Sequence, residues 1–273
     1  MDYHKIPKLP KREENSNKGS FGKILNISGS EYMSGASYLS TISALKIGAG
    51  YVVLASDEKV LNIVANLAPE VVLAPIKDIE KLLNEASVVL IGCGLSTSNK
   101  AKKVFKTTIN NRKDLPTVID ADGLNILAKL DCKLDKNVIL TPHPKEASRL
   151  LKCELEEVLN SLEESAKKIS KKYNCITVLK SHRTIVTDGE LIYKNTTGNS
   201  ALAKAGSGDV LAGIISGLLA QKMTPFEASV LGVYLHGLAG DLAKNDLTEY
   251  GVLASDTIRY IPNAIKSILN DST

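Results

Sequence analysis

The run Ala205-Gly206-Ser207-Gly208-Asp209 is the part of this 273-residue chain best suited to chemistry, and it opens a predicted helix over residues 209–221. Because two of the residues are glycines, the backbone N–H groups of 205–208 can close around an anion, and the helix dipole adds to the attraction. Asp209 lies in the first turn, where its carboxylate can accept the proton of an attacking hydroxyl. The alternative is that Asp209 only caps the helix.

Five further clusters of glycine or polar residues come directly after predicted strands. An open α/β sheet binds its ligands outside the carboxyl ends of the strands, so these clusters are expected to line one crevice. The clusters are Ser28-Gly29-Ser30, Gly92-Cys93-Gly94, Asp120-Ala121-Asp122, Thr141-Pro142-His143-Pro144 and Lys180-Ser181-His182-Arg183-Thr184.

The second and third of these clusters also have structural interpretations. Gly92 and Gly94 allow a ligand to approach closely, but two glycines equally make an ordinary strand-to-helix turn. Asp120 and Asp122 can hold a metal through water or bond a ribose. We interpret Asp122 as the cap of a helix that begins at Gly123.

Three more residues offer side chains to a ligand or to the core. His143 lies between two prolines that stiffen its backbone, which favours a ligand contact on an exposed loop. Glu146 follows in a first helical turn, where compensation of the helix dipole and coordination of Mg²⁺ explain it equally well. We predict that His236 is a packed helix residue. The four cysteines form no CxxC pair and are interpreted as fillers of core or surface.

Short β-branched runs alternate with stretches of helical apolar spacing, which predicts a mostly parallel sheet with helices on both faces. Asp188-Gly189 predicts a tight hairpin at an antiparallel edge of that sheet. We expect one domain over residues 1–273, with 1–20 as an N-terminal arm. The predicted strands are 23–28, 51–56, 71–74, 87–92, 117–120, 137–141, 175–180, 184–187 and 191–194, and the predicted helices include 36–47, 99–110, 155–173, 209–221, 225–244 and 254–269.

Composition argues against several classes of partner. Aromatic residues make up 4% of the chain and the net charge is +4, which disfavours a nucleic-acid partner. The longest apolar stretch, 210–220, is about half of what a membrane-spanning helix needs, and no apolar signal core follows Met1. Cysteines without a disulfide framework favour a reducing compartment, so a cytoplasmic location without membrane contact is expected.

From about residue 18 to 262, these motifs resemble those of the ADP- or ATP-dependent NAD(P)H-hydrate dehydratases, a branch of the ribokinase-like fold. The glycine run before Asp209 indicates only the wider fold. The more specific strings are Asp120-Ala121-Asp122-Gly123-Leu124-Asn125, Thr141-Pro142-His143-Pro144, Leu218-Leu219-Ala220-Gln221 and His236-Gly237-Leu238-Ala239-Gly240-Asp241. The resemblance implies a three-layer α/β/α sandwich.

The resemblance also implies a reaction, the repair of hydrated NADH or NADPH. The family phosphorylates the hydroxyl on the hydrated ring, using ADP or ATP with Mg²⁺, and then eliminates phosphate, a far better leaving group than hydroxide. Asp209 would be the base that activates the hydroxyl. The hydrate would contact Ala36, Gly94, His143 and Asp209, and the nucleotide would lie against Gly208 and the run Lys180, Ser181, His182, Arg183 and Thr184.

Three residues depart from the family pattern, because Cys93 stands where Pro is usual and Ser96 and Ser181 stand where Gly is usual. Ser181 falls on the nucleotide segment, where its side chain can crowd the phosphates or ribose. Likeness to bacterial stand-alone members favours ADP over ATP, and the resemblance to the family implies a homotetramer. About twenty residues precede the first motif, so we expect a separate epimerase to act on the same metabolite.

Two other functions are compatible with parts of the sequence. A ribokinase-like kinase of a small alcohol, such as a thiamin precursor, explains the glycine run but leaves the strings at 120–125 and 141–144 unused. A nucleotide-binding sensor without catalysis is disfavoured because Asp209 and the glycines before it are present.

Overall fold

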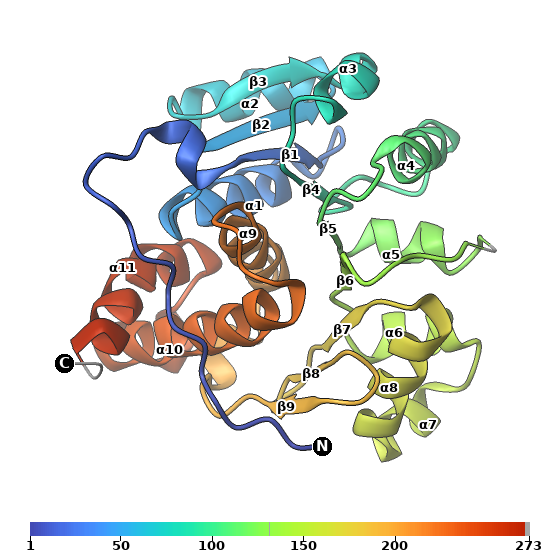
Figure 1. The fold of residues 1–273 in the computed structure, drawn as a ribbon, viewed down its shortest axis with the longest axis vertical. Coiled ribbons are helices and arrows are strands. Elements are labelled where there is room, and N and C mark those ends of the chain that lie inside the picture. Colours follow the sequence, from blue (N-terminus) through green and yellow to red (C-terminus); the bar gives the residue numbers. More distant parts are fainter. Residues whose placement is uncertain (131, 271–273) are drawn as a thin grey trace.

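A nine-stranded sheet runs through the computed structural model, which describes residues 1–130 and 132–270 (Figure 1). Its order is β3-β2-β1-β4-β5-β6-β7-β8-β9. Neighbours from β3 to β7 pair in parallel, whereas β8 is antiparallel to both β7 and β9. The strands are β1 Lys23–Ile27, β2 Tyr51–Ser56, β3 Val72–Pro75, β4 Val88–Ile91, β5 Thr117–Ile119, β6 Val138–Leu140, β7 Ile176–Leu179, β8 Ile185–Thr187 and β9 Ile192–Lys194.

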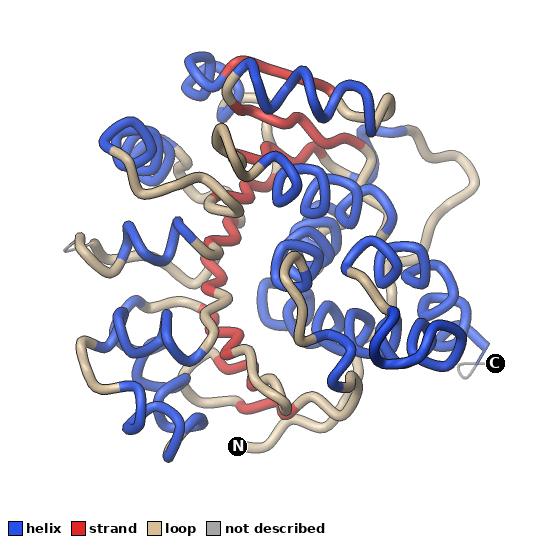
Figure 2. Tube along the Cα trace, turned by 180° about the vertical axis from the view of Figure 1, so that it is seen from behind, coloured by secondary structure: helices blue, strands red, loops and turns tan. Residues whose placement is uncertain are grey.

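Helices cover both faces of the sheet, which makes three layers (Figures 1 and 2). One face carries α1, α2 and α9 to α11, and the other carries α3 to α8. Within the described residues, no helix is long and apolar enough to cross a membrane. The helices are α1 Ser34–Lys46, α2 Glu58–Leu67, α3 Ile79–Leu83, α4 Asn99–Asn111, α5 Asp122–Leu127, α6 Pro144–Leu151, α7 Leu155–Asn160, α8 Leu162–Tyr173, α9 Ser207–Ala220, α10 Pro225–Gly251 and α11 Ala254–Asn270, with short 3₁₀ turns at Lys18–Phe21, Ile76–Asp78 and Ser200–Leu202.

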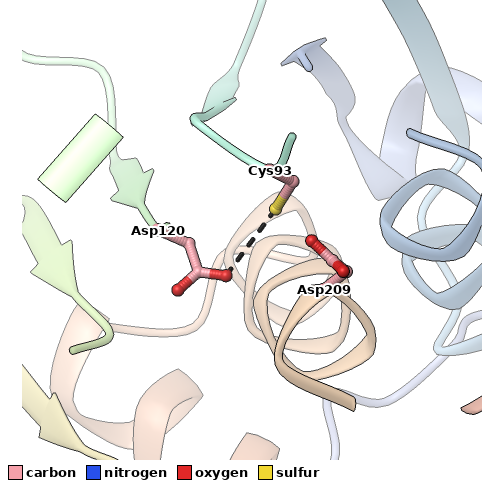
Figure 3. A group of neighbouring side chains, drawn as sticks. All are labelled: Cys93, Asp120 and Asp209. Carbon is pink, nitrogen blue, oxygen red and sulfur yellow. Dashed lines mark hydrogen bonds between the residues drawn. The ribbon is translucent and has the colours of Figure 1, made fainter. Parts of the chain in front are cut away.

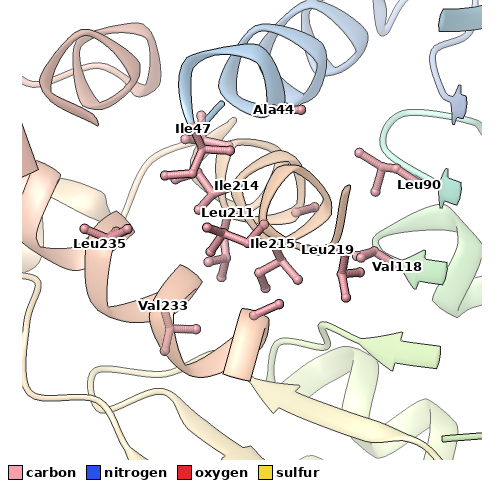
Figure 4. Close-up of a cluster of buried hydrophobic side chains, with 14 of the residues drawn as sticks. Ala44, Ile47, Leu90, Val118, Leu211, Ile214, Ile215, Leu219, Val233 and Leu235 are labelled. Atoms are coloured by element: carbon pink, nitrogen blue, oxygen red, sulfur yellow. The ribbon is translucent and has the colours of Figure 1, made fainter. Parts of the chain in front are cut away.

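Alternating side chains of the central strands fill two apolar cores. In β4, Leu90 packs with the helices of the α1 and α9 face, whereas Val89 and Ile91 pack with those of the α4 and α5 face. Burial on both faces explains why these strands are apolar throughout rather than alternating. Helix α9 is enclosed between the sheet, α1 and α10, and its core-facing residues include Leu211, Ile214, Ile215 and Leu219 (Figure 4).

The predicted sheet, its antiparallel edge and the three helices that follow residue 207 are confirmed. The hairpin turn is closed by Asp188, whose Oδ1 accepts hydrogen bonds from the N–H groups of Glu190 and Leu191. One predicted helix is wrong, because 155–173 is divided into α7 and α8 at Ser161, where φ is −148° and ψ is 60°. The apolar spacing continues across this break, so the pattern alone gave no sign of it.

The arm was predicted over residues 1–20; residues 1–17 are irregular apart from one β-bridge, whereas 18–20 belong to the 3₁₀ turn Lys18–Phe21. The arm begins beside β9, where Asp2 makes a parallel bridge to Ile192, and then runs along the α10 and α11 side of the molecule (Figure 1). Arg12 fixes its far end, because its guanidinium lies 3.5 Å from the centre of the Phe21 ring and donates to Gly48 O at 3.0 Å.

Candidate active site

The five sequence clusters lie at one edge of the sheet. They follow β1, β4, β5, β6 and β7, which are consecutive neighbours in the sheet order, so their carboxyl ends lie side by side. The clusters that the sequence predicted to gather in one place therefore follow adjacent strands. Helix α9 brings Asp209 to the same edge, because α9 packs on β1, β4 and β5.

Gly92 brings Cys93 against the neighbouring strand. Its φ is +123°, and a Cβ added there would lie 2.0 Å from Asp120 O, so only glycine fits. The Asp120 N–H donates to Ile91 O at 3.1 Å, which places the two strand ends in register. As a result, the Cys93 thiol donates to Asp120 Oδ2 at 3.7 Å, and both residues are fully buried.

Asp120 is the centre of a buried hydrogen-bond network. Its Oδ1 accepts from Lys180 Nζ at 2.8 Å and from the Thr141 hydroxyl at 2.7 Å. Burial disfavours the charged form of Lys180, but the charges of Asp120 and Glu146 outweigh this and raise the pKa of Lys180. Asp120 and Lys180 therefore form an ion pair, a type of contact that is kept in a protein interior when both members are hydrogen-bonded.

Helix α9 presents Asp209 to this network. Its N-cap is Gly206 at φ +93°, and within the described residues no side chain caps the helix. The Ser207 N–H donates to Lys204 O at 3.3 Å, so the N–H groups of Gly208 and Asp209 are the ones that remain available to an anion. Asp209 occupies the third helical position and is not the cap, so the capping alternative is wrong. Its carboxylate converges with the Cys93 thiol and the Asp120 carboxylate, the ligand atoms of all three lying within 4.8 Å of one another (Figure 3).

The surroundings make Asp209 a stronger base than a solvent-exposed aspartate. Burial, followed by the charge of Asp120, raises the pKa of Asp209 to about 6. A carboxylate with this pKa is ionised near neutral pH and still holds a proton better than an ordinary aspartate, as a general base requires.

His143 and Glu146 form a reciprocal cap at the start of α6. The Glu146 carboxylate accepts from the His143 N–H at 2.9 Å, while His143 Nδ1 accepts from the Lys145 and Glu146 N–H groups. Burial raises the pKa of Glu146 to about 7, and burial followed by the Lys180 charge lowers the pKa of His143. The Nε2 atom of His143 lies 3.4 Å from Glu146 Oε1, and the His143 side chain is still 46% exposed, so part of the ring is open to a ligand.

The run Lys180, Ser181, His182, Arg183 and Thr184 divides into two parts. Lys180 turns inward to Asp120, whereas the next four residues form a tight surface turn in which the Ser181 hydroxyl donates to Arg183 O at 2.8 Å. Arg183 is held by a bond from its guanidinium to Thr196 O at 2.9 Å. Ser181, which stands where the family usually has glycine, thus uses its side chain to close this turn.

Ala36 and Gly94 lie next to each other, as the predicted hydrate contacts require. Gly94 has φ +60°, and a Cβ there would lie 2.9 Å from Ala36 Cβ. Helix α1, which carries Ala36, also has no side-chain cap within the described residues. Its first N–H groups are available beside those of α9, against which it packs.

Asp122 does not cap α5 as predicted from the sequence. The helix begins at Asp122 itself, because the chain bends at Ala121 with φ +48°. Asp122 Oδ2 instead accepts from the Ser96 N–H at 2.8 Å. Ser96 has φ +68°, a conformation that suits glycine, so this bond holds a serine where the family usually has glycine.

Sequence reasoning missed two residues of the site. Cys93 was interpreted as a filler, but its thiol lies between two carboxylates. His236 is a packed helix residue as predicted, and its Nε2 also lies 3.2 Å from the Ser207 hydroxyl at the start of α9. Burial lowers the pKa of His236 to about 4, which keeps the ring neutral. The signals available were the position of Cys93 between two glycines after a strand and the family string that begins at His236, but neither gave the side-chain contacts.

Comparison with known proteins places the whole arrangement in one family. A sequence model of the NAD(P)H-hydrate dehydratase family matches residues 24–263. The ADP-dependent (S)-NAD(P)H-hydrate dehydratase of Neisseria meningitidis is 38% identical over 267 residues, which are 93% of this chain and 89% of that protein. The bifunctional NAD(P)H-hydrate repair enzyme of Coxiella burnetii is 38% identical over 260 residues, which are 94% of this chain and 53% of that protein. The chain thus spans about half the length of such bifunctional relatives.

A solved structure agrees. The ADP/ATP-dependent NAD(P)H-hydrate dehydratase of Bacillus subtilis, crystallised with ATP and Mg²⁺, superposes with a TM-score of 0.86 at 29% identity, covering 95% of this chain and 94% of that one. This likeness and the strand order confirm the ribokinase-like three-layer sandwich.

Proposed function

The chain belongs to the NAD(P)H-hydrate dehydratase family, and from this we propose that it restores NADH or NADPH from the S-epimer of its hydrate, using ADP or ATP. The observation that carries the proposal is the position of Asp209. A buried carboxylate with a pKa of about 6 stands in the first turn of a helix whose N–H groups have no side-chain cap within the described residues. A hydroxyl that is deprotonated there lies beside an anion-binding helix end, as phosphoryl transfer requires.

The chain's own residues supply three functions in this reaction. Ala36, Gly94 and His143 hold the hydrated ring so that its hydroxyl reaches Asp209, which takes the proton as the O–P bond forms. The N–H groups of residues 205–208 receive the transferring phosphoryl group, which comes from the end of ADP or ATP and leaves AMP or ADP. Phosphate then departs with its C–O bond electrons, assisted by the ring nitrogen, and a proton from the adjacent ring carbon is lost.

The nucleotide lies against Gly208 and the turn at 181–184. The Lys180 ammonium stands beside this route, because a Cβ added at Gly208 would lie only 3.3 Å from Lys180 Nζ. The partner of Lys180 is Asp120. We therefore propose that the Lys180 charge attracts the phosphates electrostatically without forming a permanent bond to them.

Mg²⁺ fits this site only in part. A carboxylate oxygen suits Mg²⁺, but Glu146 Oε2 already accepts from the His143 N–H, and Lys180 Nζ lies 3.9 Å from it. We therefore propose that Glu146 orients water on a Mg²⁺ carried by the nucleotide, whose phosphate charge the ion offsets.

We propose that residues 1–273 act as one domain in the cytoplasm as a homotetramer, with ADP preferred. The bifunctional relatives span about twice the matched length, and an epimerase is the proposed source of the S-epimer.

The test is recovery of the near-ultraviolet absorbance of the reduced nicotinamide ring. Purified protein is mixed with hydrated NADH, Mg²⁺ and either ADP or ATP, and the S-epimer is expected to recover with nucleotide only. Asp209→Asn should reduce the rate by about 10²–10⁴ while nucleotide still raises the melting temperature. Asp114→Asn, an exposed aspartate, is the matched control and should leave the rate unchanged.

Folded protein that recovers no absorbance with either nucleotide would overturn the dehydratase proposal. Nucleotide-dependent phosphorylation of small alcohols would then be screened, since the kinase alternative uses the same helix end and the same aspartate.

A further inference from the structure

Cys93, Asp120 and Asp209 present three metal-binding atoms to a common point. They come from the segment after β4, the segment after β5 and the first turn of α9, and their ligand atoms lie within 4.8 Å of one another (Figure 3). The Sγ of Cys93 and Oδ2 of Asp120 are 3.7 Å apart. Two ligands of a tetrahedral zinc ion, one sulfur and one carboxylate oxygen, stand roughly 3.6 Å apart, so these two atoms need almost no movement to share a cation.

A buried carboxylate oxygen points into this space with little to satisfy it. Asp120 is 1% exposed, and its Oδ1 receives both the Lys180 ammonium and the Thr141 hydroxyl. Among the described residues, the only hydrogen bond to Oδ2 is the long one from the Cys93 thiol, a weak donor. The two bonds to Oδ1 fix the carboxylate so that Oδ2 stays directed at the thiol and at Asp209.

The mixture of sulfur and oxygen selects the class of cation. Mg²⁺ prefers oxygen ligands in near-ideal octahedral geometry, whereas a thiolate beside carboxylates suits Zn²⁺ and its softer analogues. The charges also balance, because a thiolate and two carboxylates exceed a divalent cation by one negative charge, which the ammonium of Lys180 offsets. Asp209 is only partly buried, so a cation can reach the site from the side of this residue.

We propose that Cys93, Asp120 and Asp209 form a site for a thiophilic divalent cation such as Zn²⁺ or Cd²⁺, and that its occupation inhibits the enzyme. On binding, the thiol releases its proton to solvent and its sulfur bonds to the metal. The Asp209 carboxylate then serves as a metal ligand and is no longer available to a substrate hydroxyl. The binding site stands on the geometry alone, whereas the inhibition rests on the proposed function.

The first experiment titrates the full chain with Co²⁺, without nucleotide or substrate. Wild-type protein is expected to develop a thiolate-to-cobalt charge-transfer band that saturates at one equivalent and is displaced by Zn²⁺. Cys93→Ala and Cys93→Ser should lose the band, whereas Cys153→Ala, which removes a half-buried cysteine outside this site, should keep it. Absence of the band in folded wild type, or its persistence in Cys93→Ala, would overturn the proposal.

The second experiment measures inhibition by buffered free Zn²⁺ at constant Mg²⁺, each variant being compared with its own uninhibited rate. The inhibition constant should rise at least about tenfold in Cys93→Ala, the effect of losing one ligand bond, and stay unchanged in Cys153→Ala. Equal inhibition of both variants would overturn the inhibitory role. A cobalt band in a protein without dehydratase activity would instead contradict the proposed function and leave the metal site standing.

Discussion

At the scale of single residues, the site depends on one carboxylate that is hydrogen-bonded by three donors and a second that is left basic. Asp120 receives an ammonium, a hydroxyl and a thiol, which stabilise its negative charge in a buried position. Asp209, a few ångströms away, experiences that charge, which together with burial outweighs the opposing effects of the Cys93 thiol and the Lys180 charge. Their different surroundings therefore give the two aspartates different roles, whereas in water the two side chains would behave alike.

Substitution of Asp120 by Asn should weaken Asp209 as a base. The charge of Asp120 is the second cause, after burial, of the raised pKa of Asp209, so its removal should move the acid limb of kcat/KM from about pH 6 to lower pH. Asp122→Asn is the matched control, since Asp122 contributes less and should shift the limb less. Full pH profiles of both variants test this. A limb that stays in place or moves upward in Asp120→Asn would contradict the electrostatic role.

Glu146 should limit stability at neutral and alkaline pH. Its pKa is about 7 in the folded protein against an ordinary 4.5, so the folded state holds the proton more tightly than the unfolded chain. Its contribution to stability is complete below about pH 4.5 and is lost as pH rises through about 7. Glu146→Gln should therefore raise the free energy of unfolding at pH 8 by about 1–3 kcal/mol, and the gain should vanish near pH 4.5.

Glu157 is the control for this prediction, because it occupies the third position of α7 and makes the same kind of capping bond. Glu157 accepts from the Glu154 N–H at 3.0 Å in an exposed setting, so Glu157→Gln should show no such pH-dependent gain. Urea unfolding at several pH values measures both variants. A gain at pH 8 accompanied by lower activity would show that Glu146 is kept for function at the expense of stability.

At the scale of elements, glycines set the distance between α1 and α9. A Cβ on Gly213 would lie 2.0 Å from Ser43 Oγ and 2.2 Å from Ser40 O, and a Cβ on Gly217 would lie 2.1 Å from an Ile47 methyl group. At these glycines the backbone of α9 therefore lies directly against α1. This close packing also fixes where the uncapped starts of both helices stand at the sheet edge.

Gly217→Ala should consequently destabilise the protein by about 1–3 kcal/mol, because the added methyl group forces α1 and α9 apart. It should also lower the affinity for nucleotide, since the start of α9 moves with the helix. Gly35→Ala in α1 is the control: a Cβ there meets nothing within 4 Å, so helix propensity should leave stability equal or slightly higher. Chemical unfolding and nucleotide titration of both variants decide the matter. Equal stability of the two would refute the packing argument.

The elements themselves were largely predictable because their signals are local. Apolar periodicity indicated the parallel strands and most helices, and Asp188-Gly189 indicated the hairpin. The break at Ser161 was missed because it leaves the apolar period unchanged on both sides. Asp122 was misassigned because the helix starts one residue early, after Ala121, whose φ is positive. The sequence gives no indication that an alanine adopts a positive φ.

The contacts within the site were less predictable, because they join residues far apart in the chain. The strand-end rule placed Asp120 and Lys180 in one crevice but gave no reason to pair them across 60 residues. The thiol of Cys93 could be placed only once the strand order set β4 beside β5. The sequence therefore predicts which segments meet, whereas the partner of each buried charge depends on the strand order.

At the scale of the whole molecule, the N-terminal arm protects an edge of the sheet. β9 is the last strand, and an unpaired strand edge favours association with other chains. The arm shields it, because Ile192 N–H donates to Met1 O at 2.9 Å and the Tyr3 N–H donates to Ile192 O at 2.7 Å. The Tyr3 ring also meets Phe226 of α10 edge-to-face, with ring centres 5.2 Å apart.

Removal of residues 1–5 should therefore have two separable effects. Loss of the backbone bonds and the aromatic contact should lower the free energy of unfolding by about 2 kcal/mol. The freed β9 edge should also increase concentration-dependent association beyond the wild-type assembly. Tyr3→Ala in the full chain removes only the ring contact, so it should lose stability without gaining association. Urea unfolding and light scattering over a concentration series distinguish the two, and truncated protein that matches Tyr3→Ala in both measurements would show that the arm does not protect the edge.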